Sequence, residues 1–179
     1  MLSAETARIE ATGQQYPAHH RYLIYMMDNT NMAVLRKLEK NDFEAWLKLW
    51  KLYLEFYRHP FDAEVTQFSF DRFIYANGDM HCAVVEEAGQ VVGFVHYIFH
   101  PSTWSKGYYC YLQDLYVLQD QRSQGFARQL IEYVYECAQA RNCSRVYWLT
   151  HESNGRAMAL YDKVADNAGF IQYRKNFSQ

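Results

Sequence analysis

Three strand-like runs followed by one long amphipathic helix constrain the fold more than any other feature of the sequence. Residues 81–87, 91–100 and 109–118 are rich in β-branched and aromatic side chains, and short turn-forming or polar segments separate them. A helix over 125–141 follows directly. Its apolar stripe consists of Ala127, Leu130, Ile131, Val134 and Ala138. These segments predict a sheet that begins as an antiparallel meander and packs against a helix.

The flanking sequence predicts further strands and helices around this meander. A helix begins after Asn41 or Asp42, either of which can cap it, and a second helix covers about 64–75. The other expected elements are strands over 32–38, 145–150 and 170–175 and a helix that Asn154 caps and that reaches about residue 165. Meandering strands followed by crossover units imply the α/β (α+β) class, with a mixed sheet and helices on both faces.

Length and composition fit one globular domain. The chain has 179 residues, of which 50% are hydrophobic, so it can bury a core and is far too apolar for a disordered protein. Residues 1–31 lack a regular pattern, and we interpret them as an N-terminal extension of a single domain over 32–179.

Charge and cysteine content narrow the class of partner. The net charge of −2 gives no support for a general nucleic-acid binder. No apolar run is long enough to span a bilayer, and the charged first ten residues do not resemble a secretory signal, so we expect a cytoplasmic protein without a membrane partner. The four cysteines form no C-x-x-C pair and lie beside no histidine cluster, which predicts reduced thiols and no metal site.

The segment Arg122-Ser-Gln-Gly-Phe-Ala127 lies between the third strand of the meander and the long helix. A helix start presents unpaired backbone N–H groups and the positive end of the helix dipole, so it suits an anion. Gly125 lets a diphosphate approach the backbone closely, Ala127 is small, and Arg122 can add a charged contact. The segment has neither the Gly-Lys-Ser/Thr of a Walker A loop nor the three glycines of a dinucleotide fingerprint. By itself it is equally consistent with an ordinary strand-to-helix turn.

Three motifs in order resemble the GNAT superfamily of N-acetyltransferases. Arg122-x-x-Gly125-x-Ala127 is similar to that family's acetyl-CoA pyrophosphate loop, and the preceding Gln113-Asp-Leu-Tyr-Val117 to its fourth strand. Asn154-x-x-Ala157-x-x-Leu160-Tyr-Asp-Lys163 resembles its second signature helix. Within the superfamily, the motif Trp46-x-x-x-Trp50-x-x-Tyr53 most resembles the yeast group of histone/polyamine and D-amino-acid N-acetyltransferases. The resemblance implies a mixed, mostly antiparallel sheet of six to seven strands.

The resemblance also implies how acetyl-CoA is held and used. It places a bulge in the fourth strand, so that the backbone of Leu115, Tyr116 and Val117 faces the pantetheine arm and the Leu115 N–H stabilises the oxyanion. Tyr161 would give a proton to the departing thiolate, although its position on an apolar stripe is equally that of a packing residue. The full set of expected cofactor-binding residues is Leu115, Tyr116, Val117, Arg122, Ser123, Gln124, Gly125, Phe126, Ala127, Asn154 and Tyr161. For Asn154 a plain helix N-cap is the alternative.

The acceptor amine is expected beside Gln113 and Asp114. Asp114 could hold the ammonium or draw its proton through a water molecule, and the alternative is a carboxylate bonded to backbone at the strand end. Polyamine acetyltransferases often carry an acidic residue at the position of Gln113. The neutral Gln113 amide therefore weakens the case for a polycationic acceptor. Tyr57 and Trp104 are expected to line the acceptor pocket. We interpret His96 and His100 chiefly as core or edge residues.

Several functions remain open on the sequence alone. We favour acetyl transfer to the primary amine of a small molecule, an amino acid or a polyamine-like amine, and keep a protein lysine as a second acceptor class. A non-catalytic acyl-CoA-binding module and an unrelated nucleotide-binding domain also fit the pattern. Since the residues after Gly169 suffice for one strand where the family has two, a sheet edge would stay open. We therefore expect the extension, at Tyr22–Met27, or a second subunit to cover that edge.

Overall fold

The computed structural model describes residues 23–27, 31–75 and 78–177, with side chains from residue 33 onward. Contacts divide the chain into two compact units, one ending at Trp148 and one beginning at Leu149. None of the helices described there is both long and apolar enough to cross a membrane.

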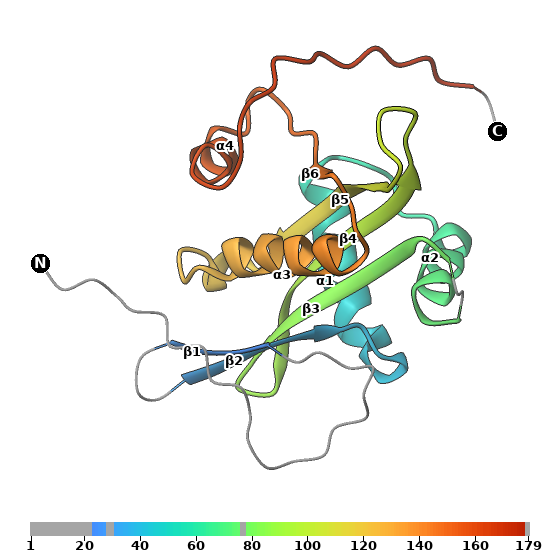
Figure 1. The fold of residues 1–179 in the computed structure, drawn as a ribbon. Coiled ribbons are helices and arrows are strands. Elements are labelled where there is room, and N and C mark those ends of the chain that lie inside the picture. The colour runs from blue at the N-terminus through green and yellow to red at the C-terminus, as the bar shows by residue number, and fades with distance from the viewer. Residues whose placement is uncertain (1–22, 28–30, 76–77, 178–179) are drawn as a thin grey trace, which may run out of the picture. The chain divides into compact units, whose positions relative to one another are not determined.

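The first unit is built on a sheet whose strands follow each other in chain order (Figure 1). Within the described ranges it has six strands: β1 (Leu23–Met27), β2 (Asn31–Lys37), β3 (Met80–Glu87), β4 (Gln90–Pro101), β5 (Tyr108–Val117) and β6 (Arg145–Tyr147). Neighbours pair antiparallel from β1 to β5, and β6 pairs with β5 in parallel. This arrangement confirms the predicted mixed, mostly antiparallel sheet.

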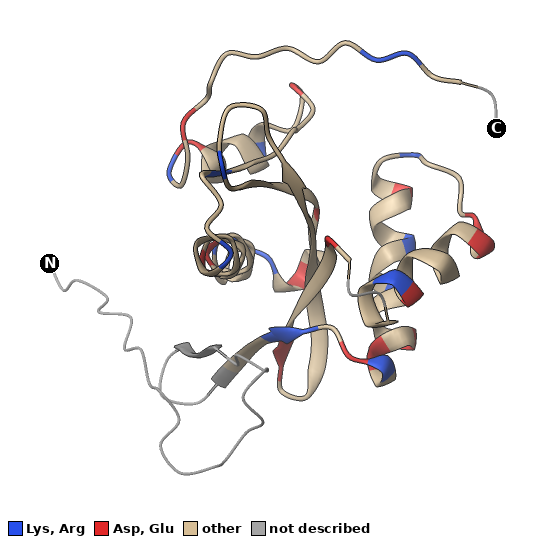
Figure 2. Ribbon diagram, turned by 45° about the vertical axis from the view of Figure 1, so that its right-hand side comes forward, with Lys and Arg blue, Asp and Glu red and all other residues tan. Residues whose placement is uncertain are grey.

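Helices cover both faces of this sheet, because successive side chains of a strand point to opposite sides. On one face α1 (Phe43–Phe56) and α2 (Ala63–Tyr75) enclose a core with Phe94 of β4. On the other face α3 (Phe126–Ala140) packs against β4 and β5, and Tyr97 donates a hydrogen bond to the Cys137 thiol. Figure 2 shows that charged residues lie mainly on the helices, in the connecting segments and at the sheet margin. Asp114 of β5 is an exception, because it lies within the sheet and pairs with His96 of β4.

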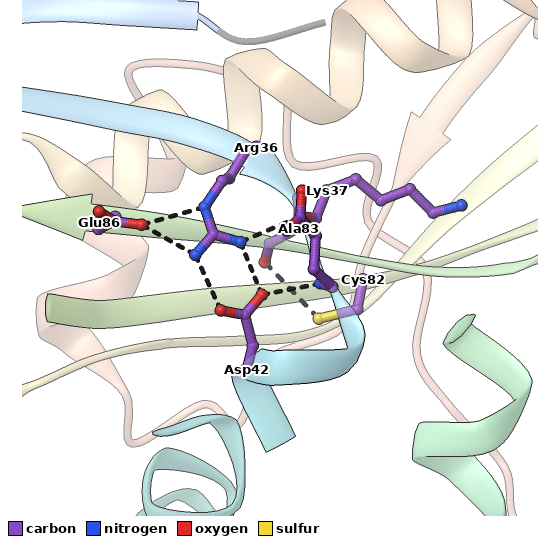
Figure 3. A network of polar contacts seen from close by, with 7 residues as sticks. Arg36, Lys37, Asp42, Cys82, Ala83 and Glu86 are labelled. Carbon is purple, nitrogen blue, oxygen red and sulfur yellow. Dashed lines mark hydrogen bonds and ion pairs between the residues drawn. The ribbon is translucent and has the colours of Figure 1, made fainter. Parts of the chain in front are cut away.

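An ion network ties the start of α1 to the sheet (Figure 3). Arg36 of β2 donates to both carboxylate oxygens of Asp42, at 2.6 and 2.8 Å, and to Glu86 of β3. Asp42 is the N-cap residue of α1, as predicted, but its side chain makes no capping bond to that helix and accepts instead from the Glu39 N–H at 2.7 Å. The carboxylate therefore fixes the short 3-10 turn before α1 to β2.

One irregularity in the sheet shapes the site. Cross-strand pairing runs from His96↔Asp114 to Tyr97↔Leu112, so Gln113 has no partner on β4 and forms a β-bulge. A bulge at this strand is the one that the family resemblance implied. The extra residue separates the regular first half of β5, which pairs with β6, from its second half, which leads to α3.

The second unit differs from the predicted elements. Its helix α4 spans Gly155–Tyr161, shorter than the expected helix that reaches residue 165. The expected strand over 170–175 is wrong, since these residues form no strand and expose Phe170 (80%) and Tyr173 (90%). A run of apolar and aromatic residues becomes a strand only when a neighbouring strand pairs with its backbone. The described residues provide no such strand here.

The two margins of the sheet also differ from expectation. Leu23–Met27, within the predicted extension, does form a strand, but β1 pairs with β2 and leaves the β6 margin uncovered by any strand that the structure describes. Tyr22 lies outside the described residues. β6 is three residues long, half of the strand expected over 145–150.

Candidate active site

The turn between β5 and α3 is the centre of the candidate site. Gly125 is the N-cap residue of α3 and has a φ of 90°, and Ser123 has a φ of 69°. A glycine adopts this left-handed backbone without strain, whereas a side chain at Gly125 would be strained. The space a Cβ would occupy there is open, with the nearest neighbouring atom 3.9 Å away. A bulky anion can therefore approach the main chain at this point.

The first turn of α3 offers amide groups to such an anion. The first hydrogen bond within the helix joins the Gln129 N–H to the Gly125 carbonyl at 3.0 Å. The preceding amides, those of Phe126, Ala127 and Arg128, therefore have no acceptor within the helix. Within the described part of the chain, no protein acceptor is seen for these three amides. The first turn of α3 carries no acidic residue either. The residues present thus fit a diphosphate group at the positive end of the helix dipole.

Arg122 connects this turn to the end of β5. Its Nε donates to the Val117 carbonyl at 3.1 Å, and its guanidinium lies 5.7 Å from the centre of the Tyr116 ring. The turn is further held by Gln124, whose side-chain amide donates to Gln121 at 2.8 Å. The predicted charged contact from Arg122 is left to its two terminal nitrogens, because its Nε is already engaged.

The second half of β5 exposes backbone groups on the side away from β4. The Leu118 N–H bonds to the Val92 carbonyl at 2.9 Å, so the alternation of an antiparallel ladder directs the Tyr116 groups toward β4 and those of Leu115 and Val117 away from it. On that other side β6 pairs only with residues 109–111. Of the three residues expected to face the pantetheine arm, Leu115 and Val117 have backbone groups in the required direction, and Tyr116 does not.

Asp114 lies at the centre of a buried polar cluster on the α1 face. Tyr53 of α1 donates to Asp114 Oδ1 at 2.7 Å, and His96 Nδ1 lies 3.0 Å from Oδ2. The Trp46 indole N–H lies 2.9 Å from His96 Nε2. The Asp114 side chain is 12% exposed. The structure therefore shows a carboxylate that is bonded to side chains rather than to backbone, with a small part still accessible.

The surroundings of Asp114 disfavour ionisation of the neighbouring groups. Burial, and next the Asp114 charge, raise the pKa of the Tyr53 phenol far above its ordinary value. Burial likewise raises the pKa of the Cys82 thiol well above its usual range. Tyr53 therefore acts as a hydrogen-bond donor at neutral pH and cannot serve as a base.

The other residues expected beside the acceptor differ in whether they lie near Asp114. Gln113, on the bulge, is exposed, and the Tyr57 ring lies beside that of Tyr53 in a tilted arrangement, with ring centres 4.9 Å apart. Trp104 lies in the loop between β4 and β5, is 80% exposed, and has no described contact with this cluster. His100 bonds to the Tyr147 hydroxyl at 3.0 Å, as an edge residue would. The structure thus brings Tyr57 toward Asp114 but not Trp104.

The two residues expected from the second unit are both on α4. Asn154 is the N-cap residue, but its side chain makes no capping bond and donates to the Thr150 hydroxyl at 3.3 Å. Tyr161 is the last residue of α4 and is partly buried. Its role as proton donor stays a prediction.

Sequence reasoning missed the partners of Asp114. The sequence presents Trp46 and Tyr53 only as one apolar helix face, and His96 mainly as a core histidine. The helical spacing of seven residues does place Trp46 and Tyr53 on one side of α1, which is the available signal. What brings them onto a single carboxylate is the cross-strand pair His96↔Asp114, which no local pattern reveals.

Comparison with known proteins agrees with this geometry. A model of the acetyltransferase (GNAT) family matches residues 46–165, which include most of α1, the bulged strand, the turn between β5 and α3, and α4. The chain belongs to the GNAT acetyltransferase family. Acetyl-CoA is accordingly its acyl donor, and the acetyl group is transferred to an amine.

Two curated relatives of this GNAT protein have named acceptors. A D-amino-acid N-acetyltransferase of Saccharomyces cerevisiae is 38% identical over 145 residues, covering 80% of this chain and 90% of the relative. A thialysine N-epsilon-acetyltransferase of Bos taurus is 38% identical over 89 residues, covering 45% of this chain and 52% of the relative.

Solved structures confirm the GNAT fold. The aminoglycoside N-acetyltransferase AAC(6')-Iy in complex with CoA superposes with a TM-score of 0.71 at 17% identity, covering 85% of this chain and all of that chain. A ribosomal-protein-alanine N-acetyltransferase from Brucella melitensis superposes with a TM-score of 0.66 at 20% identity, covering 81% and 99%. Since these two have acceptors of different classes, the fold alone does not identify the acceptor.

Proposed function

We propose that this GNAT enzyme acetylates the primary amine of a small molecule, an amino acid or a polyamine-like amine. The observation that carries the proposal is the pair of adjacent features at the end of β5. The first turn of α3 offers three amides to a diphosphate, and the strand leading into it turns the Leu115 backbone and the Val117 N–H away from β4, beyond the residues that pair with β6. The small-molecule class is supported by the relatives named for a D-amino acid and for thialysine.

The anion-binding turn fixes the donor. In this proposal the amides of Gly125–Arg128 bind the diphosphate of acetyl-CoA, and the terminal nitrogens of Arg122 add charge. Ser123, Gln124, Phe126 and Ala127 shape the turn around it. Binding at this end of α3 aligns the pantetheine arm along the open side of β5, where the thioester meets the Leu115 amide.

Two groups act on the thioester. The Leu115 N–H donates to the carbonyl oxygen as negative charge develops there, which lowers the barrier to attack by the amine. Tyr161, whose phenol is protonated at neutral pH, donates to the departing thiolate. Asn154 is proposed to contact the cofactor arm from the start of α4.

The acceptor side is proposed to include Asp114, Gln113 and Tyr57. Asp114 presents a carboxylate at the bulge, and Gln113 presents an exposed amide next to it. A single carboxylate with an uncharged amide beside it suits one ammonium group better than a polycation. One carboxylate beside one neutral amide therefore favours amino acids among the small amines.

A thiol-release assay over a panel of amines tests the proposed function. The panel contains D- and L-amino acids, thialysine, spermidine and a lysine-containing peptide, each with acetyl-CoA. We expect turnover with one or more free small amines and at least tenfold lower kcat/KM with the peptide. Turnover of the peptide alone would assign a protein lysine as acceptor, and binding of acetyl-CoA without turnover of any amine would indicate a non-catalytic acyl-CoA-binding module.

We also propose that the enzyme is a cytoplasmic homodimer. Phe170, Ile171 and Tyr173 are highly exposed on a segment without secondary structure, and β6 has no strand on its outer side among the described residues. Exposed apolar residues and an open sheet margin both favour pairing with a second chain. Light scattering of the full chain is expected to give twice the mass of the monomer, and the mass of one chain would contradict the dimer.

A further inference from the structure

The hydrogen-bonded chain around Asp114 has a defined direction. The Trp46 indole N–H can only donate, so His96 Nε2 accepts its hydrogen bond. His96 therefore carries its proton on Nδ1 and donates it to Asp114 Oδ2 at 3.0 Å. Tyr53 donates its hydroxyl proton to Oδ1 at 2.7 Å. Every donor in the chain is directed toward one carboxylate, and this arrangement fixes the orientation of that carboxylate.

Among the described residues, no lysine or arginine is seen in an ion pair with this carboxylate. The titratable groups whose interaction with it is described are Tyr53 on α1, Cys82 on β3 and His96 on β4. None is a lysine or arginine, and the indole above His96 fixes the neutral imidazole. Phe73 of α2 contributes only its ring, stacked on His96. A desolvated anion without a cationic partner is costly, and a bound cation would relieve that cost.

We propose that Trp46, His96 and Tyr53 are positioning residues that hold Asp114 as an aimed, ionised carboxylate, and that Asp114 binds the acceptor as its ammonium ion. The inference rests on the proposed function and names the form in which the substrate arrives. Asp114 is 12% exposed, so one ammonium group can reach it, and the half-exposed Tyr57 ring lies beside Tyr53. A primary ammonium near a carboxylate and a phenol face is stabilised by both.

The proton balance of the reaction gives this carboxylate a task. The ammonium must lose one proton before its nitrogen has a lone pair, and Asp114 takes that proton directly or through a water molecule. The nitrogen then forms a bond to the acetyl carbon, and the carbon–sulfur bond breaks as the resulting oxyanion returns its electron pair to the carbonyl. The nitrogen loses a second proton as the amide forms, and that proton replaces the one that the proposed donor Tyr161 gives to the thiolate. One proton is released to solvent in each turnover, from Asp114.

A double-mutant cycle tests whether Tyr53 acts through Asp114. We expect Tyr53→Phe to lower kcat/KM for the amine about tenfold, since one hydrogen bond to the charged group is lost, with KM for acetyl-CoA unchanged within about twofold. In an Asp114→Asn background the same substitution is expected to have no further effect.

Matched variants separate positioning from packing. His96→Asn keeps a donor near the position of Nδ1, whereas His96→Leu has similar size without one, so we expect Asn to retain several times more activity than Leu. Tyr97→Phe is the control, because its buried hydroxyl bonds to Cys137 on the opposite face of the sheet. It is expected to leave kcat/KM for the amine unchanged.

Two results would overturn the inference. Tyr53→Phe with wild-type kcat/KM would remove Tyr53 from the site, and an equal loss in both backgrounds would show that it acts on packing and not through Asp114. A wild-type protein that turns over no amine contradicts the proposed function, and calorimetry with propylamine on the CoA-bound protein then decides the inference. Weaker propylamine binding by Tyr53→Phe and Asp114→Asn supports the inference, and propylamine binding equal to that of wild type overturns it.

Discussion

At the scale of single residues, the chemistry depends on which side chains hold or give protons. Tyr53 and Tyr161 carry the same phenol but are given different roles. Tyr53 is buried against a carboxylate, which raises the pKa of its hydroxyl far above the ordinary value and makes it a permanent donor. Tyr161, at the end of α4, is proposed to donate transiently to a thiolate.

Replacing Tyr161 tests this second role. Tyr161→Phe is expected to lower kcat by about ten- to a thousandfold, because the thiolate must then leave without a proton donor, while KM for acetyl-CoA stays within about threefold. Steady-state kinetics of thiol release measure both constants. Tyr173→Phe is the matched control, since it removes an exposed phenol from the same unit. An unchanged kcat would exclude Tyr161 from the mechanism.

At the scale of elements, the local sequence pattern was enough to predict a helix or strand where that element's own residues determine it. The amphipathic stripe of α3 and the alternating run of β4 were predicted within about one or two residues of their observed ends. The short β6 and the absence of a strand at 170–175 could not be predicted, because a strand depends on a neighbour that no local pattern specifies. The cluster on Asp114 was hidden for the same reason, as it forms across three elements.

The conformation of the anion-binding turn gives a second prediction. Gly125→Ala is expected to destabilise the protein by only about 1 kcal/mol, the cost of a side chain at positive φ where space is open. The same methyl group stands where the diphosphate must approach, so KM for acetyl-CoA is expected to rise about tenfold or more. Urea unfolding and donor kinetics separate the two effects. An unchanged KM would contradict close approach of the donor at this residue.

The contact between β4 and the end of β5 gives a third prediction. A Cβ on Gly93 would lie 2.8 Å from the Tyr116 carbonyl oxygen and 3.1 Å from a Val117 methyl group. Gly93→Ala must therefore displace backbone and is expected to cost about 2 kcal/mol of unfolding free energy. Since the displaced segment carries the Leu115 amide, kcat should fall as well. Gly89→Ala in the β3–β4 turn is the control for stability, because Gly89, unlike Gly93, is at positive φ but no atom lies within 4 Å of the added Cβ. Equal effects of the two substitutions would contradict the steric argument.

At the scale of the whole molecule, stability should fall in mild acid because of His81. Burial, followed by the nearby Arg141 charge, lowers the pKa of His81 to about 4 in the folded protein. An unfolded histidine titrates near its ordinary value of about 6.5, so between these values the unfolded state binds more protons. The stability is complete above about pH 6.5 and decreases as the pH falls toward 4.

We expect this histidine to cost about 1 kcal/mol of unfolding free energy between pH 7 and pH 5, after allowance for its partial exposure. Urea unfolding of wild type and His81→Gln at both pH values measures the contribution. The variant should lose less stability over this interval than wild type. The same loss in both proteins would show that His81 is not the group responsible.

The central claim is that the first turn of α3 binds the donor's diphosphate through main-chain amides. The most direct test is an NMR titration of the isotope-labelled protein with CoA, followed at the backbone amides of Gly125, Phe126, Ala127 and Arg128. We expect these resonances to shift downfield and saturate together, as the amide protons enter hydrogen bonds to phosphate oxygens. Saturable CoA binding that leaves these four amides unchanged would contradict the claim and with it the proposed position of the thioester beside Leu115.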